Sequence, residues 1–405
     1  MKILIRWVRL VTPASEAPRG KTFGNLNITP GQDVVFDDGI ITAIRAGDPN
    51  APPPNPGLYD KVIEGEGLIL MPGFVDCHTH ACWAGSRLDE WQMKLQGATY
   101  LSILAKGGGI MSTVRAVREA SEKSLSSGLL SNLQEMLAAG TTTAEVKSGY
   151  GLSTHDELKM LRAIHAAAPL WPGTLRATAL LGHAIDPDQP DFVNRTINDT
   201  LPAVHAEFPT IPIDLFLEQG AWTLADATRL LDKALTLGHP IRFHADQFNS
   251  LGGVPLAIRL NARSVDHLEA STPADLAALG QSDTIAVGLP ICGLHLDGRY
   301  ANLRALLDAG ASIALATNFN PGSAPSCSLP MAIATAVRHC GLTPHEAIVA
   351  ATSGAARVLA LPNRGRLQVG FPADALLLNI RDERELAFRL GMSSIRQVFT
   401  GKRDT

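Results

Sequence analysis

The chain has few cysteines, and their arrangement does not suggest a disulfide framework. Five cysteines are scattered through 405 residues and no two have CxxC spacing; they are Cys77, Cys82, Cys292, Cys327 and Cys340. An odd number without regular spacing argues against disulfide scaffolds and favours a reducing compartment. We therefore expect a cytoplasmic protein that does not depend on disulfide bonds.

A surplus of positive charge is also lacking. The formal net charge is −4 and the pI is about 6.3. We therefore expect no nucleic-acid partner and no polybasic membrane anchor. Arg6 and Arg9 interrupt the apolar residues of the N-terminus, which excludes a signal-peptide core, and no apolar run is long enough to span a bilayer. With nucleic acid and membranes disfavoured, we expect a small molecule as the partner.

What the sequence does contain is enough apolar material for a large core. Hydrophobic residues make up 45% of the chain and charged residues 18%. These proportions exclude global disorder. The length allows one barrel of about 250 residues with a smaller addition, or two to three ordinary domains.

Both ends of the chain have the pattern of short strands. Two apolar runs, 34–36 and 40–44, flank Asp37-Asp38-Gly39, which is typical of a hairpin turn. Proline-rich residues 49–57 predict a surface loop, and strand-like runs return near the C-terminus. We predict a small β-sandwich domain composed of residues 1–65 and 365–405.

The middle of the chain, residues 66–364, alternates between strand-like and helix-like patterns. Eight apolar strand-like runs are found at 69–76, 142–147, 175–182, 211–217, 240–244, 263–267, 284–289 and 311–317. Helical stretches lie between most of them, among them Leu158–Ala167, Leu224–Leu237 and Leu303–Leu307. Eight βα units in series predict an α/β protein with a (β/α)8 TIM barrel. A doubly wound sheet is the alternative, but no glycine-rich phosphate turn follows the first strand.

Histidines gather where the predicted strands end. Five of the twelve histidines occupy such ends: His78, His80, His183, His244 and His267. In a barrel these positions converge on the C-terminal mouth, where active sites lie. His78 and His80 are two residues apart on a strand, so both point to one face and can share a metal ion. Alone this pair is a weak signal; with His244 it predicts a metal site.

Other polar residues at the strand ends have plainer interpretations. Lys147 could be carboxylated and bridge two metals, but we favour a lysine paired with Glu145 or exposed beside the mouth, and a single metal. The run Gly107-Gly108-Gly109 could cradle an anion and is more often a flexible turn. Cys77 and Cys82 are expected to be buried neighbours of the site and not nucleophiles.

Several longer motifs resemble one family. The segment Pro72-Gly-Phe-Val-Asp-Cys-His-Thr-His80 is similar to the opening metal motif of the amidohydrolases. More specific motifs resemble imidazolonepropionases: Ala84–Arg87, Leu95–Tyr100, Gly107–Arg115, Glu145–Gly151, Phe243–Phe248 and Asn320–Ser323. The resemblance runs from about residue 30 to residue 380.

The resemblance implies a site and a reaction. It implies one divalent or trivalent metal ion, zinc or iron, held by His78, His80, His244 and the residue at position 318. It implies that Arg87 binds the substrate propionate, since a guanidinium suits a carboxylate. Further substrate contacts would come from Tyr150, His183, Gln247, Asn320, Gly322 and Ser323. The reaction is the opening of 4-imidazolone-5-propanoate by activated water to give N-formimino-L-glutamate, and a homodimer is expected.

Two departures from the family pattern stand out. Asn318 replaces the aspartate expected at the metal, and an amide cannot accept the proton of the attacking water. The chain is therefore either a variant impaired at this base, which we favour, or uses a different base. The candidates for the catalytic step are Asn318, His267 and Gln247. The segment 289–296 also differs, and it overhangs the mouth.

The departures keep two alternatives open, one suggested by the segment 289–296 and the other by Asn318. One is hydrolytic removal of sulfur from 3-(5-oxo-2-thioxoimidazolidin-4-yl)propionate, as in ergothioneine breakdown, with Cys292 or His295 near the sulfur. The other is a non-catalytic ligand-binding homologue. Comparing the two rings as substrates of the Asn318→Asp form discriminates among the three.

Overall fold

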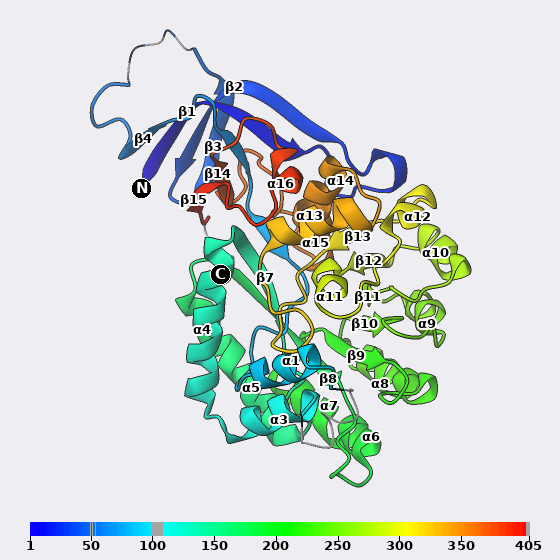
Figure 1. Cartoon of the computed structure of the whole chain (residues 1–405). Coiled ribbons are helices and arrows are strands. Elements are labelled where there is room, and N and C mark those ends of the chain that lie inside the picture. Colours follow the sequence, from blue (N-terminus) through cyan, green and yellow to red (C-terminus); the bar gives the residue numbers. More distant parts are fainter. Residues whose placement is uncertain (49, 51, 53, 99–107, 402–405) are drawn as a thin grey trace.

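The structure of the chain, a computed structural model, describes residues 1–48, 50, 52, 54–98 and 108–401. Its first part is a sheet built from both ends of the chain (Figure 1). The strands run in the order β15-β14-β5-β1-β2-β3, with β4 beside β1. Their bounds are β1 Lys2–Pro13, β2 Leu26–Asp37, β3 Ile40–Ala46, β4 Lys61–Glu64, β5 Ile69–Pro72, β14 Ala375–Leu378 and β15 Ile395–Phe399. Strands from both ends of the chain thus share one sheet, not the two packed sheets of a sandwich, and β5, which pairs with β14, lies beyond the expected boundary at residue 65.

The predicted hairpin joins β2 to β3. Asp38 and Gly39 form its turn with φ of 47° and 75°. Positive φ at both central residues gives a turn whose twist matches the strands that it joins, and Gly39 adopts it without strain. Alternate strand residues such as Val34 and Ile41 are buried in this sheet's own apolar core.

The second part is an eight-stranded parallel barrel in sequence order (Figure 1). Its strands are β6 Phe74–Asp76, β7 Thr141–Lys147, β8 Thr174–Gly182, β9 Ile213–Leu217, β10 Arg242–Ala245, β11 Ser264–His267, β12 Ile285–Gly288 and β13 Ile313–Leu315. Between β13 and β6 the barrel closes just beyond the strand ends. There the Asn318 amide donates to the His78 carbonyl at 3.0 Å, and the His80 amide to the Phe319 carbonyl at 2.9 Å. The predicted barrel is confirmed, and its closure brings His78 and Asn318 together.

One predicted strand proves to be two. The run 69–76 is divided at Gly73, so that β5 belongs to the first sheet and β6 to the barrel. A side chain at Gly73 would be 2.1 Å from the Thr142 hydroxyl, which is far inside contact distance. Only glycine lets the chain pass this close to β7, and hydropathy alone could not show the break.

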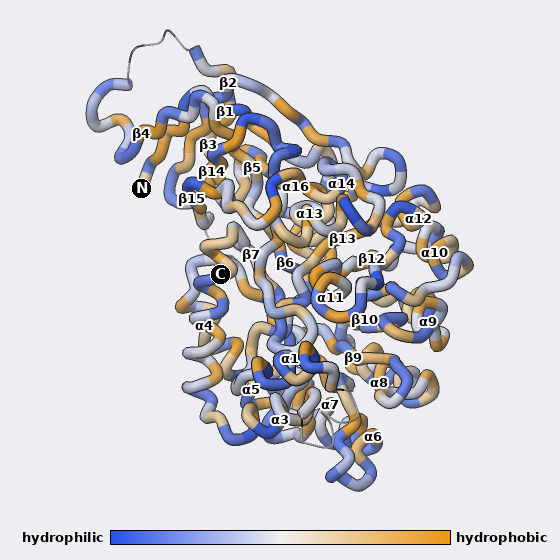
Figure 2. The backbone as a smooth tube through the Cα atoms, viewed as in Figure 1, coloured by the Kyte–Doolittle hydropathy of each residue, from blue (hydrophilic) through white to orange (hydrophobic). Residues whose placement is uncertain are grey.

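Helices surround the barrel, as the alternation predicts. They are α1 Leu88–Leu95, α3 Ile110–Glu119, α4 Glu122–Ala138, α5 Thr154–Ala167, α6 Phe192–Arg195, α7 Leu201–Glu207, α8 Leu224–Thr236, α9 Gly253–Arg259, α10 Pro273–Gly280, α11 Pro290–His295, α12 Leu303–Asp308, α13 Leu329–His339, α14 Pro344–Val349, α15 Ala355–Val358 and α16 Glu385–Phe388. Figure 2 shows apolar and polar stretches alternating along helices such as α4 and α8, as expected for helices with one buried face.

Side-chain caps explain where several helices begin. The hydroxyls of Ser153, Thr223 and Thr272 each accept a hydrogen bond from a backbone amide in the first turn. Such caps satisfy amides that have no partner within the helix.

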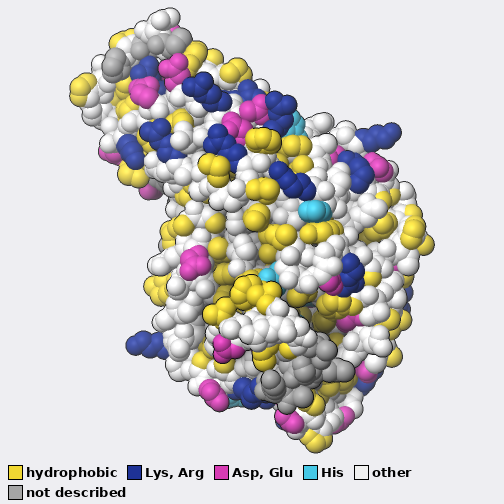
Figure 3. All heavy atoms as spheres, in the orientation of Figure 1, with side chains coloured by type: hydrophobic (Ala, Val, Ile, Leu, Met, Phe, Trp, Pro, Cys, Tyr) yellow, Lys and Arg dark blue, Asp and Glu magenta, His cyan; other side chains and the backbone are white. Residues whose placement is uncertain are grey.

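Among the described residues, no helix is both long and apolar enough to cross a membrane. On the face shown in Figure 3, acidic and basic side chains are interspersed.

Candidate active site

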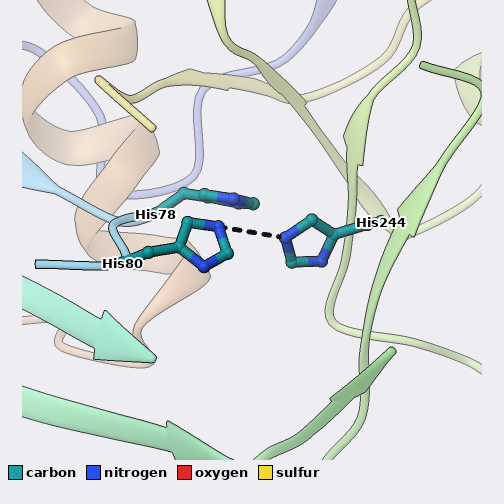
Figure 4. Close-up of side chains that lie close together, drawn as sticks. All are labelled: His78, His80 and His244. Atoms are coloured by element: carbon teal, nitrogen blue, oxygen red, sulfur yellow. Dashed lines mark hydrogen bonds between the residues drawn. The ribbon is translucent and has the colours of Figure 1, made fainter. Parts of the chain in front are cut away.

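Three imidazoles converge at the C-terminal mouth of the barrel (Figure 4). His78 and His80 directly follow β6, and His244 lies in β10. One ring nitrogen of each lies within 4.8 Å of one nitrogen of the other two. The Nε2 atoms of His80 and His244 face each other at 3.5 Å. The spacing predicts a shared metal ion, and these three side chains are brought together as that prediction requires.

The three rings have the protonation that a metal ligand needs. Burial lowers the pKa of His78, His80 and His244, because the charged form would be desolvated, so the neutral imidazoles dominate. Within the described part of the chain, His78 Nε2 and His80 Nδ1 have no hydrogen-bond partner although both are buried. A buried polar atom without a partner is costly unless a ligand satisfies it. The residues therefore fit a bound metal.

Carboxylates orient two of the three rings. Asp266 lies 2.5 Å from His78 Nδ1, and Asp214 lies 3.0 Å from His244 Nδ1. An Nδ1 proton shared with a carboxylate leaves the Nε2 lone pair free and raises its basicity, as is usual for histidines that ligate metals. Sequence reasoning gave neither aspartate a role. The available signal was a charged residue inside an otherwise apolar barrel strand.

The two aspartates belong to a buried network of charges beneath the site. Lys147 contacts Glu145 at 2.7 Å and Asp214 at 2.8 Å, and its side chain is fully buried. Arg242 joins Glu145 at 2.9 Å to Asp266 at 2.7 Å. The predicted pairing of Lys147 with Glu145 is confirmed. Because every charge here has an opposite neighbour, the network holds its carboxylates, and through them the histidines, in place.

Asn318 lies beside the histidines at the end of β13. Its backbone amide donates to His78, and its φ is 57°, a left-handed value that asparagine tolerates better than most residues. Its side-chain oxygen is buried and has no hydrogen-bond partner among the residues described. A buried carbonyl oxygen without a partner, on a residue whose backbone contacts His78, can serve as a weak, uncharged fourth ligand.

Two ring-bearing residues flank the histidines. His183 stacks on His80, with ring centroids 4.8 Å apart, and Tyr150 lies 5.1 Å from His183. Burial lowers the pKa of His183 to about 3, and its Nδ1 pairs with the Gly149 carbonyl at 3.0 Å. His183 is therefore neutral with its Nε2 unconstrained by that bond, and it can face a planar ring.

The turn after β13 is organised by Asn320. Its side-chain oxygen accepts from the amides of Gly322 and Ser323, both at 2.8 Å, and its side-chain nitrogen donates to the Asn318 carbonyl at 2.6 Å. This Asx-type turn rigidifies the loop. Asn320 therefore holds the loop in place, with both ends of its amide engaged in the turn.

Arg87 approaches this turn from the segment after β6. A side chain at Gly322 would be 3.0 Å from Arg87 Nη1. The Nε and Nη2 atoms of Arg87 both contact Glu90, each at 2.6 Å. The two-pronged side of the guanidinium, which we expected to face the substrate, is thus held by Glu90. The Nη1 side, near Gly322 and Thr113, is the part directed toward the turn.

His267 and Gln247 complete the predicted set. The His267 ring lies 6.0 Å from that of His78 and 5.7 Å from that of His244, measured between centroids. Gln247 follows β10 and donates from Nε2 to the Cys292 sulfur at 3.3 Å. His267 therefore borders the histidine cluster, and Gln247 contacts the neighbouring Cys292.

Two expectations concern cysteines and glycines. Cys77 and Cys82 are buried, and burial raises the pKa of both thiols, so neither is an activated nucleophile. Gly107 and Tyr100, which the motifs include, lie outside the described residues. Of the glycine run, the Gly109 amide donates to Glu90 at 3.1 Å.

Comparison with known proteins identifies the family of the chain. The family model described as the amidohydrolase family matches residues 69–181 and 231–402. Solved structures with the same fold include a 5-methylcytosine deaminase from Klebsiella pneumoniae (TM-score 0.74, 17% identity, 99% of this chain and 96% of that one) and a guanine deaminase from E. coli (TM-score 0.73, 14% identity, 99% and 97%). The chain belongs to the amidohydrolase family, whose members are metal-dependent hydrolases.

Within that family the similarity is narrower. The chain is 44% identical over 390 residues to an imidazolonepropionase from Rubrobacter xylanophilus, covering 94% of this chain and 92% of that protein. It is 41% identical over 393 residues to an imidazolonepropionase from Deinococcus radiodurans, covering 96% of both. The predicted resemblance to imidazolonepropionases is confirmed over nearly the full length.

Proposed function

We propose that this chain hydrolyses the ring of 4-imidazolone-5-propanoate to give N-formimino-L-glutamate. The observation that carries the proposal is the cluster of three neutral imidazoles with unpartnered buried nitrogens, in a chain that is 44% identical to a protein named imidazolonepropionase. The first test is direct: ring opening followed by loss of the imidazolone absorbance, with purified protein and a matched His244→Ala control.

The proposed metal ligands are His78, His80, His244 and, through its amide oxygen, Asn318. When bound, the metal supplies Lewis-acid chemistry and makes water a stronger nucleophile at neutral pH. We propose one zinc or iron ion per chain, since imidazole and amide oxygen suit both. Elemental analysis of purified protein discriminates between them, and His78→Ala should lose the metal.

Substrate recognition falls to the rim of the site. Arg87 would bind the propionate through its Nη1 side, beside the rigid turn that contains Gly322 and Ser323. His183 and Tyr150 would pack against the flat ring, and Gln247 would contact its polar edge. These groups come from separate loops of the barrel, so together they fix both ends of the substrate.

Proton transfer is the step in which this chain departs from the family pattern. Asn318 cannot accept a proton, so we assign the task to His267, which is the next imidazole along the mouth. A base that is not optimally placed gives slow turnover. The proposed enzyme is therefore a slow hydrolase, and His267→Asn should reduce kcat with little change in the metal bound by His78, His80 and His244.

Removal of sulfur from a 2-thioxo ring is not favoured. The curated relatives named above are imidazolonepropionases at 41–44% identity over more than nine-tenths of this chain. The same similarity to enzymes disfavours a non-catalytic binding protein. Sulfide release from the thioxo ring, measured beside ring opening of the oxo ring, tests this choice.

Assembly and location are part of the proposal as well. We propose a homodimer in the cytoplasm; the location agrees with free cysteines, and the dimer rests on the family resemblance alone. Light scattering coupled to gel filtration measures the mass in solution, and a monomer at assay concentrations would exclude the dimer.

A further inference from the structure

A second group of potential ligands lies beside the histidine cluster. It consists of His267 at the end of β11, Glu269 two residues later, and Cys292 in α11 (Figure 1). One nitrogen, one carboxylate oxygen and the sulfur of these residues all lie within 4.8 Å of one another. The three residues come from two neighbouring βα units, so the fold itself brings them together.

An independent feature points to a missing ligand here. The Glu269 side chain is only 5% exposed, yet its Oε2 atom has no hydrogen-bond partner among the described residues. Its Oε1 atom contacts His267 Nδ1 at 3.3 Å, which is long for a charge-assisted hydrogen bond. A buried carboxylate with one oxygen unpaired and the other loosely held is costly unless a cation satisfies it.

The donor set also identifies the kind of cation. Imidazole nitrogen, carboxylate oxygen and thiolate sulfur together suit zinc, which accepts all three, and do not suit magnesium or calcium. Ligand atoms around a tetrahedral zinc ion stand roughly 3.5 Å apart. The present spacing of up to 4.8 Å therefore needs only a modest contraction.

We propose that His267, Glu269 and Cys292 form a second, lower-affinity metal site that takes zinc, distinct from the site of His78, His80 and His244. On binding, a metal–sulfur bond forms as the Cys292 thiol gives its proton to solvent. Gln247 then donates its existing hydrogen bond to a thiolate instead of a thiol, a contact typical of the surroundings of metal thiolates.

Occupancy of this site would inhibit the enzyme, and this part rests on the proposed function. With zinc on Nδ1 of His267, the single ring proton must reside on Nε2. That nitrogen can then donate a proton but cannot accept one. Since Asn318 cannot accept a proton either, zinc would remove the base that this chain has left.

The test uses metal titration of the purified, metal-loaded protein. Zinc content after equilibrium dialysis should rise from about one to about two ions per chain in the wild type. Cobalt(II) adds a second measurement: the proposed first site has no sulfur ligand, so a near-ultraviolet sulfur-to-cobalt charge-transfer band reports the second site alone. Cys292→Ser should lose both the second ion and the band. Cys327→Ser, which changes a thiol that is not part of either cluster, should keep both.

Glu269→Gln gives an independent variant, because it removes the carboxylate and keeps the cysteine. It should weaken binding of the second zinc ion by at least tenfold, while the first metal ion stays bound. A wild type that binds one ion only, or a cobalt band that survives in Cys292→Ser, would overturn the site. A second ion that binds without inhibiting ring opening would overturn only the inhibition, and with it the role of His267.

Discussion

The carboxylate of Asp266 lies 2.5 Å from Nδ1 of His78, and both side chains are fully buried. The same carboxylate oxygen contacts Arg242 at 2.7 Å, so the aspartate is itself held in place. This relationship fixes the ring orientation of His78 and leaves its Nε2 directed at the cluster.

Replacing Asp266 by Asn should therefore weaken metal binding. Loss of a carboxylate that orients a ligating histidine typically costs about 10–100-fold in metal affinity. Competition with a chromophoric chelator measures this. Ser264→Ala is the matched control, since Ser264 contacts Arg242 but not His78. Equal affinity in Asp266→Asn and the wild type would show that the contact does not tune the metal.

Arg87 should act on substrate affinity. Arg87→Lys keeps the charge but loses the planar group, and should lower kcat/KM by about 1–3 kcal/mol in transition-state terms. Glu90→Gln loosens the guanidinium without removing it and should have a smaller effect in the same direction. Arg384→Ala, at an exposed arginine paired with Asp382, is the control. An unchanged kcat/KM in Arg87→Ala would place the propionate elsewhere.

Glu157 should be important for stability. Its buried carboxylate accepts from three backbone amides, those of Gly149, Gly151 and Leu152, at 2.8–2.9 Å. Glu157→Ala leaves these amides without partners and should lower the free energy of unfolding by on the order of 2–4 kcal/mol. Thermal or urea unfolding measures this, with the exposed Glu119→Ala as control. A loss below about 1 kcal/mol would mean that solvent replaces the carboxylate.

Much of the fold could be predicted because its signals are local. Seven of the eight predicted barrel runs correspond to single strands, as in 142–147 against Thr141–Lys147. The break at Gly73 could not be predicted from the sequence. It depends on how closely Thr142 approaches Gly73, and Thr142 is distant in sequence. Hydropathy is insensitive to such contacts.

The candidate site, like the fold, could be predicted only in part. The three histidines follow from strand spacing. Glu90 as the partner of Arg87, and Asp214 as the partner of His244, depend on which loops and strands the barrel makes neighbours. A charged residue inside a strand, as in the run 211–217, signals burial of a charge but does not identify its partner.

Asn318 should limit the rate. Its side-chain oxygen is buried without a partner among the described residues, and its backbone amide donates to His78, at a position where the family resemblance calls for an aspartate. A carboxylate there can orient the attacking water and accept its proton, whereas an amide can only orient it. Because a positioned general base contributes about 10²–10⁴-fold, Asn318→Asp should raise kcat by about that factor.

Substrate affinity should change little in the same variant, because the proposed contacts come from Arg87, Tyr150 and the turn 320–323. The measurement is kcat and KM for both forms at equal metal occupancy, with Asn302→Asp, at an exposed asparagine that caps α12, as the matched control. The variant also separates the two candidate bases. In the Asn318→Asp form, a second substitution, His267→Asn, should cost less than it does in the wild type, since the aspartate then takes the proton. If Asn318→Asp is no faster than the wild type, position 318 is not the place of the base, and His267 or His183 fills that role in both forms.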